Sequence, residues 1–193
     1  IDRIKDSQIV YFYIKWKPMR FKITFLFLFI GIFIGCTKES SEDESTESKD
    51  LKGQIAIKIL NKTNAIRSAQ GLKDLLQDDE MDALASLHSE NMITYDFFDH
   101  VDHEGKSPSE RADDLDFVWS SIAENIGYIP WFENVIGCGD TRSAEAIAEC
   151  VVEGWRNSPG HYTNMIGDFD ELGVGVAFTQ DSTAYFTQVF RTR

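Results

Sequence analysis

The chain has 193 residues, of which 42% are hydrophobic and 12% aromatic, and its formal net charge is −13 at pH 7. This length suits one folded domain with appendages, and the apolar content is sufficient for a core. The negative charge argues against nucleic-acid binding and against docking on anionic lipids through a basic patch, because those partners are also negatively charged.

The N-terminal segment has the pattern of an export signal. Arg20 and Lys22 precede an uncharged apolar run over 25–35, which is too short for a membrane span of ~20 residues. The run ends in Gly35 and Cys36. This ending resembles the lipobox of bacterial lipoproteins, in which the cysteine thiol is acylated and the chain is cut just before it. We therefore expect the chain to be anchored to a bacterial membrane through Cys36, with a retained, uncleaved signal anchor as the alternative.

The residues after Cys36 predict a flexible tether. The stretch 37–50 contains many acidic residues and serines and no large apolar side chain, so it cannot bury enough surface to offset its ordering entropy. An acidic stretch at this place resembles surface-export signals of some Gram-negative lipoproteins, which favours the outer membrane or the cell surface. The expected parts are upstream sequence over 1–18, a signal peptide over 19–36, a disordered tether over 37–52 and a domain over 53–193.

Apolar periodicity predicts three long helices in the domain. The first covers 55–69 and ends before Gly71, and the second covers 81–92. The third covers 143–155 and is followed by a break at Pro159.

A short helix and two strands complete the predicted domain. Ser107 and Glu110 can form a capping box for the short helix. Segments 172–179 and 184–191 read as two strands joined by a hairpin turn, whereas 122–129 is ambiguous. Helices first and an antiparallel pair last predict an α+β fold with helices packed on a small sheet.

Three cysteines are present. If Cys36 carries lipid, Cys138 and Cys150 remain as a pair in an oxidising compartment. We expect a disulfide between them, and two buried free thiols are the alternative.

Two histidines and one acid could carry chemistry, although from spacing alone the three could be unrelated. His100 lies beside aromatic residues, and His161 begins a short segment after a Pro-Gly break, where a neutral ring able to bind metal is expected. Glu124 lies among apolar residues and needs a partner. His88, on a predicted helix face, is interpreted as a core histidine.

The ordered segments together resemble the CAP superfamily, also called SCP (cysteine-rich secretory protein, antigen 5 and pathogenesis-related proteins), in its bacterial branch. The resemblance covers roughly residues 59–190 and depends on several motifs in the expected order. These motifs are Asn61, Asn64 and Arg67; Phe98-Asp99-His100 with Gly105 and Arg111; Ala123-Glu124-Asn125-Ile126; Trp155 to Ile166; Leu172-Gly173-Val174-Gly175; and Tyr185 to Phe190.

The resemblance implies a three-layer α-β-α sandwich whose central cleft gathers two histidines and two glutamates. His100, Glu124 and His161 occupy three of those positions. The family's second glutamate stands three residues after the tryptophan of the helix, where this chain has Ser158, so the set is incomplete.

Two imidazoles and a carboxylate are a suitable ligand set for Zn²⁺ or another divalent metal. We expect His100, Glu124 and His161 to be metal ligands in a module that binds an unknown small-molecule, lipid or peptide ligand. The alternatives are a metal-dependent hydrolase acting on peptide, cell-wall or lipid substrates, for which no catalytic residue can be named, and a purely structural polar core.

Overall fold

The structure, a computed structural model, describes residues 42–193, with side chains from Asp50 onward. The expected upstream sequence, the signal peptide and Cys36 lie outside the described residues. The elements in chain order are α1 (Glu42–Ala69), β1 (Leu76–Gln77), α2 (Asp79–Thr94), α3 (Pro108–Asp114), β2 (Ser121–Pro130), α4 (Ala144–Arg156), α5 (Pro159–Met165), β3 (Glu171–Phe178) and β4 (Thr183–Thr192).

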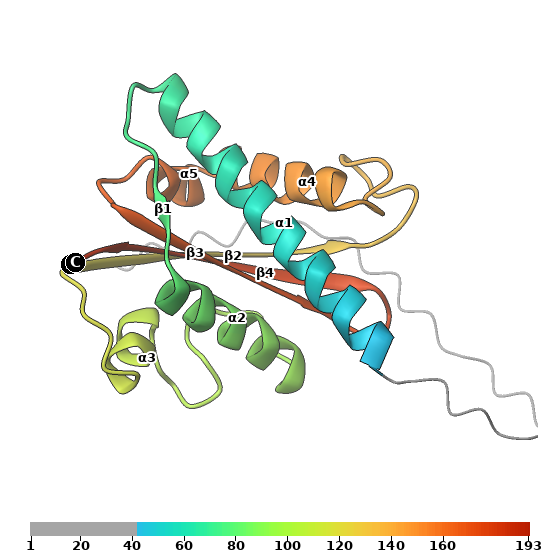
Figure 1. The fold of residues 1–193 in the computed structure, drawn as a ribbon, viewed down its shortest axis with the longest axis horizontal. Coiled ribbons are helices and arrows are strands. Elements are labelled where there is room, and N and C mark those ends of the chain that lie inside the picture. The colour runs from blue at the N-terminus through green and yellow to red at the C-terminus, as the bar shows by residue number, and fades with distance from the viewer. Residues whose placement is uncertain (1–41) are drawn as a thin grey trace, which may run out of the picture. The chain divides into compact units, whose positions relative to one another are not determined.

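The described elements form three layers around one sheet. The strand order is β1-β3-β4-β2; β4 pairs antiparallel with both β3 and β2, and β1 pairs parallel with β3. Figure 1 shows α2 and α3 on one face of the sheet and α1, α4 and α5 on the other. This arrangement is the three-layer α-β-α sandwich that the sequence resemblance implies.

Glycines in β3 allow α2 to lie directly on the sheet. A Cβ added at Gly173 would lie 2.0 Å from the backbone of Met81, and one at Gly175 would lie 2.2 Å from the backbone of Ala85. Because no side chain keeps the two elements apart, Ser89 of α2 reaches Thr187 of β4 with an Oγ–Oγ1 distance of 2.8 Å. The close approach buries a mostly apolar face of α2 that also includes His88 and Ser89.

The predicted helices are confirmed, and so is the expected capping box of the short helix. The Asp78 side chain accepts a hydrogen bond from the Met81 backbone at the start of α2, and Ser107 and Glu110 form the capping box of α3. The ambiguous segment 122–129 is strand β2, and the two C-terminal strands form the predicted antiparallel pair. Strand β1 was not predicted.

Helix α1 begins earlier than expected. It starts at Glu42, so residues 42–52 are helical, and the expected disordered tether over 37–52 is wrong for this part. Leu51 packs partly against the hydrophobic core, and Asp50 accepts a hydrogen bond from Gln54 one turn later. Both contacts favour continuing the helix in the N-terminal direction. Within 42–193, no helix is both long and apolar enough to cross a membrane.

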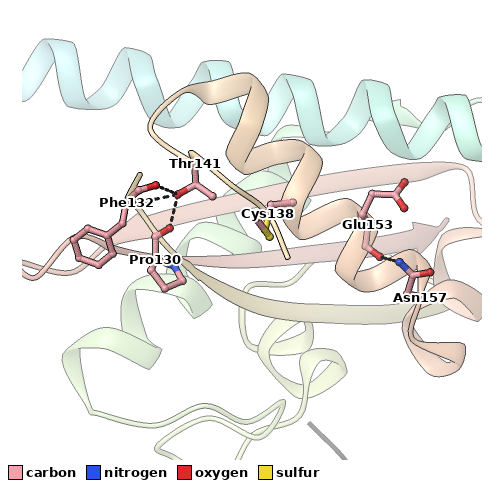
Figure 2. Close-up of a disulfide and its surroundings, with 7 residues drawn as sticks. Pro130, Phe132, Cys138, Thr141, Glu153 and Asn157 are labelled. Carbon is pink, nitrogen blue, oxygen red and sulfur yellow. Dashed lines mark hydrogen bonds between the residues drawn. A yellow bond between two sulfur atoms is a disulfide. The ribbon is translucent and has the colours of Figure 1, made fainter. Parts of the chain in front are cut away.

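The predicted disulfide is present. Cys138 in the loop after β2 is bonded to Cys150 in α4, with 5.4 Å between their Cα atoms. Figure 2 shows the disulfide and its surroundings, including Thr141, whose hydroxyl donates to the Pro130 carbonyl and accepts from the Phe132 backbone N–H. The loop is therefore tied to helix α4 covalently and to the end of β2 by hydrogen bonds.

Candidate functional site

The three predicted site residues come from three separate segments that meet at β2, an edge strand of the described sheet. Glu124 lies in β2, His100 in the loop between α2 and α3, and His161 in α5. Because side chains alternate along a strand, Glu124 faces the α2–α3 layer, where it contacts Arg111, and Asn125 faces α5. The candidate site therefore lies around the edge of the sheet.

Glu124 is buried and holds one partner with each carboxylate oxygen. Its side chain is 1% exposed. Its Oε1 lies 2.9 Å from His100 Nδ1, and its Oε2 accepts a 2.5 Å hydrogen bond from a terminal guanidinium nitrogen of Arg111. The positive charge of Arg111 compensates the buried carboxylate, which explains how an acid is accommodated among apolar residues.

The loop that carries His100 is closed by backbone contacts. Asp102 Oδ1 accepts hydrogen bonds of 2.9 Å from the backbone N–H groups of Glu104 and Lys106. Burial by itself would raise the pKa of Asp102, but these two backbone bonds and the nearby Arg111 hold it below its usual value. Arg111 also donates to the carbonyls of His100 at 2.8 Å and Lys106 at 3.0 Å, so one guanidinium fixes both ends of the loop.

His88 lies behind this loop and is fully buried, as its interpretation as a core residue requires. Its Nε2 lies 3.0 Å from the carbonyl of Asp99 and 3.7 Å from Oε1 of Glu124. Burial lowers the pKa of His88, Glu124 opposes this shift, and Arg111 and His100 add to it. His88 is therefore a neutral core histidine that also contacts the candidate site, which the sequence did not indicate.

His161 is positioned through its backbone. Its carbonyl accepts a 3.1 Å hydrogen bond from Asn125, and Asn164 donates to the Glu124 carbonyl and to Asn125, so α5 is docked on β2. Within 42–193 no hydrogen bond to the His161 ring is found. Burial lowers the pKa of His161, and the nearby His100 lowers it further. The neutral ring expected from the sequence is supported, although burial rather than the helix terminus is the cause.

Arg67 holds the segment that follows α5. It is buried and donates to the carbonyls of Met165 at 3.0 Å and Gly167 at 2.8 Å. Because these carbonyls adjoin the C-terminal end of α5, helix α1 fixes the short helix that carries His161. This contact gives a structural reason for an arginine that appeared in the sequence motifs without a role.

Ser158 does not replace the family's second glutamate. It precedes α5 as the N-terminal cap residue, but its side chain makes no capping hydrogen bond. No carboxylate orients the His161 ring within the described residues, whereas Glu124 orients His100.

The three-ligand metal set expected from the sequence is not formed. Within 42–193, no group of three histidine, cysteine, aspartate or glutamate side chains is arranged to hold a metal ion. Glu124 is already bound by His100 and Arg111. Glu124 therefore contacts the His100 ring, and the His161 ring has no carboxylate partner within the described residues.

Exposed apolar side chains flank His100. Val101 is 46% exposed, and Phe98 is 42% exposed and forms a T-shaped pair with Tyr128, with 5.0 Å between the ring centroids. Tyr128 and Tyr185 stack at 5.6 Å beside it. An apolar and aromatic surface thus adjoins the polar site.

A separate cavity of about 350 Å³ lies between α1, α4 and α5. Its walls include Lys62, Glu149, Arg156 and Tyr162, and none of the three predicted site residues lines it. This cavity is therefore distinct from the His100–Glu124–His161 site.

Two proteins of Bacillus subtilis are similar in sequence. The chain is 32% identical over 136 residues to the uncharacterized membrane protein YlbC, an alignment that covers 70% of this chain and 34% of that protein. It is 29% identical over 134 residues to the uncharacterized protein YkwD, which covers 69% of this chain and 45% of that protein. The chain spans less than half the length of these relatives.

Solved structures show the same fold. An extracellular protein containing a SCP domain from Bacillus anthracis superposes with a TM-score of 0.61 at 24% identity, covering 77% of this chain and 43% of that one. An outer surface protein from Borrelia burgdorferi superposes with a TM-score of 0.57 at 20% identity, covering 83% of this chain and 99% of that one. Residues 60–190 match the family model described as CAP, the cysteine-rich secretory protein family, and the chain therefore belongs to the CAP family.

Proposed function

We propose that this chain is a membrane-anchored, extracytoplasmic binding module whose ligand contacts the imidazoles of His100 and His161. The main support for this proposal is the contrast between the two groups of the His100–Glu124 pair. The Glu124 side chain is 1% exposed, whereas the His100 side chain is 47% exposed. A network with a purely structural role would close over both groups, but this one holds an imidazole at the surface.

The two imidazoles support binding of a divalent transition metal such as zinc. His100 engages Glu124 through Nδ1, which leaves Nε2 as its available nitrogen. His161 is close enough for His100 to lower its pKa, and burial keeps its ring neutral, as metal coordination requires. A bound zinc ion would supply Lewis-acid chemistry with open coordination positions.

The surroundings favour an amphipathic ligand. Phe98 and Val101 expose apolar surface on either side of His100. A small molecule, lipid or peptide with one polar group could place that group at the imidazoles and its apolar part on these side chains.

The relatives and the disulfide support an extracytoplasmic location. One similar protein is named as extracellular, one as an outer surface protein and one as a membrane protein. The Cys138–Cys150 disulfide suits an oxidising compartment. Acylation of Cys36 would supply the anchor.

Zinc titration of the purified chain by calorimetry tests the binding site. Wild type should bind zinc, and the double variant His100→Ala, His161→Ala should lose this binding. His103→Ala is the matched control, because His103 is an exposed histidine that stacks on Tyr95 at 3.5 Å. Equal zinc affinity in wild type and the double variant would overturn the site assignment. Turnover of a peptide and ester panel that is lost in the double variant would favour the hydrolase instead.

The anchor is tested separately by labelling with a fatty acid in a bacterial host. Wild type should incorporate the label and fractionate with membranes, and Cys36→Ser should do neither. Label incorporation that persists in Cys36→Ser would show that the anchor lies elsewhere.

A further inference from the structure

We infer that His88 and Arg111 are positioning residues that fix the His100 ring with Nδ1 toward Glu124 and Nε2 toward the ligand. This inference rests on the proposed function and deepens it, because it names the ring atom that the site offers. Neither residue was a candidate site residue in the sequence. Both act through His100 rather than by touching the ligand.

Arg111 fixes the partner of the His100 ring as well as its backbone. It is 4% exposed and hydrogen-bonds both the Glu124 carboxylate and the His100 carbonyl. Arg111 is paired with the Glu124 carboxylate and donates to its Oε2. An ionised carboxylate only accepts hydrogen bonds. His100 Nδ1 must therefore carry a proton to bond with it.

His88 fixes the peptide on the other side of His100. Its Nε2 lies 3.0 Å from the Asp99 carbonyl, which only accepts hydrogen bonds, so Nε2 carries the proton. Together His88 and Arg111 hold two consecutive carbonyls, those of Asp99 and His100. The backbone that bears the exposed imidazole is thus held from both sides by buried side chains.

The fold keeps these polar groups in place at an energetic cost. Within the described residues, His88 Nδ1 and Arg111 Nε are buried and have no hydrogen-bond partner. A buried polar atom without a partner destabilises the folded state, and an apolar residue at either position would avoid that cost. In this structure, His88 and Arg111 instead use their other polar atoms to hold the Asp99 and His100 carbonyls.

These contacts together select one tautomer of His100. With Nδ1–H donated to Glu124, the lone pair of the ring lies on Nε2, away from the buried carboxylate. Only this nitrogen is then available to a metal ion or to a hydrogen-bond donor of a ligand. Loss of Arg111 or His88 should let the ring rotate or exchange tautomers.

Histidine ¹⁵N NMR of the full chain reads the tautomer directly. The wild-type protein should show His100 with Nδ1 protonated and Nε2 unprotonated. Arg111→Met and His88→Phe should give averaged His100 nitrogen shifts and a zinc affinity lower by about 10–100-fold, the usual range for residues that orient a metal ligand. His88→Gln keeps a donor for the Asp99 carbonyl, and Arg111→Lys keeps the positive charge. Each should restore part of the wild-type His100 nitrogen shifts and part of the zinc affinity.

Matched controls separate positioning from general damage. Arg142→Met removes an exposed arginine that pairs with Glu133 and Asp140, and His103→Phe replaces an exposed histidine; neither should change the His100 signals. If Arg111→Met does not fold, the comparison of His88→Phe with His88→Gln decides. Wild-type His100 signals in folded Arg111→Met and His88→Phe would overturn the inference. Absence of zinc binding by wild type with the predicted tautomer intact would overturn only the metal part of the proposed function.

Discussion

The two histidines of the candidate site are held in different ways, although both meet at strand β2. The His100 ring is fixed by a buried carboxylate, and its backbone is held by His88 and Arg111. The His161 ring has no hydrogen-bond partner within 42–193, and its helix is docked through the backbone and Asn164. One half of the site is therefore ordered at the ring and the other only at the main chain.

This difference follows from one position in the sequence. Glu124 orients His100, whereas Ser158 stands where the family resemblance places a second glutamate. The Ser158 hydroxyl makes no capping hydrogen bond, and it does not orient the His161 ring as Glu124 orients the His100 ring. Within the described residues, the His100 ring therefore has a carboxylate partner and the His161 ring has none.

The largest expected effect is on the free energy of unfolding, which should fall more when the Glu124 side of the site is changed than when His161 is changed. Glu124→Ala leaves Arg111 buried without its carboxylate, and breaking a buried ion pair destabilises by about 3–5 kcal/mol. His161→Ala removes a half-buried ring that has no hydrogen bond within residues 42–193, and this loss should be less than half as large. Urea denaturation of both variants measures the two losses. Equal losses would show that the two halves are held equally.

Removing the disulfide tests whether a loss of overall stability is enough to change the His100 tautomer. Replacing Cys138 and Cys150 with serine should destabilise by about 3 kcal/mol, because the bond closes a short loop of the unfolded chain. The His100 tautomer should stay unchanged, since the His100 ring is held by Glu124 and its carbonyl by Arg111, whereas the disulfide joins the loop after β2 to α4. Denaturation and histidine NMR on the same sample provide both readings, and a changed tautomer would mean that the ring is not controlled locally.

Restoring the missing acid should make the two halves alike. Ser158→Glu should order the His161 ring and raise zinc affinity by about tenfold, since orienting residues usually contribute 10–100-fold. Ser158→Gln, of nearly equal size but without charge, is the control. Calorimetry measures both affinities, and a weaker affinity in Ser158→Glu would mean that the serine does not limit the site.

The smallest expected effect is a pH dependence of the unfolding free energy, to which His88 should contribute more than His161. Burial lowers the pKa of His88 and of His161 below the ordinary value of 6.5, so below that pH the unfolded state binds more protons. The unfolding free energy should therefore fall as the pH drops below 6.5, by at most about 1.4 kcal/mol per pH unit for each group.

His88 and His161 can be separated by removing one at a time. His88→Gln should flatten the acid side of the stability curve more than His161→Gln, because His88 is fully buried and His161 is not. Thermal or urea denaturation across the pH range measures the slopes. A steeper slope in His88→Gln than in wild type would mean that protonation of His88 does not oppose folding.

Local signals account for most of what the sequence predicted about the fold. The caps of α2, α3 and α4 and the apolar periodicity of their faces lie within each element, so they can be read without knowing the tertiary structure. Strand β1 has only two residues and exists through parallel pairing with β3, a contact that no local pattern encodes. Leu51 of α1 likewise packs against the core through tertiary contacts that no local pattern encodes.

The site was predicted only in part. Family resemblance, rather than spacing, named His100, Glu124 and His161 together. The buried position of Glu124 required a partner, and Arg111 could have been proposed on that ground, but a sequence separation of 13 positions does not show that the two side chains meet. The contact of His88 with the Asp99 carbonyl depends on the packing of α2 against the loop, which is a tertiary feature.

The proposed function depends above all on His100 and His161 facing one common point. Histidine ¹⁵N NMR during zinc titration is the decisive experiment, because all four histidines are observed at once. We expect His100 Nε2 and the His161 ring to respond at the same zinc concentration, while His88 and His103 do not. Separate responses of His100 and His161, or a response of His103 alone, would show that the two imidazoles do not share a ligand.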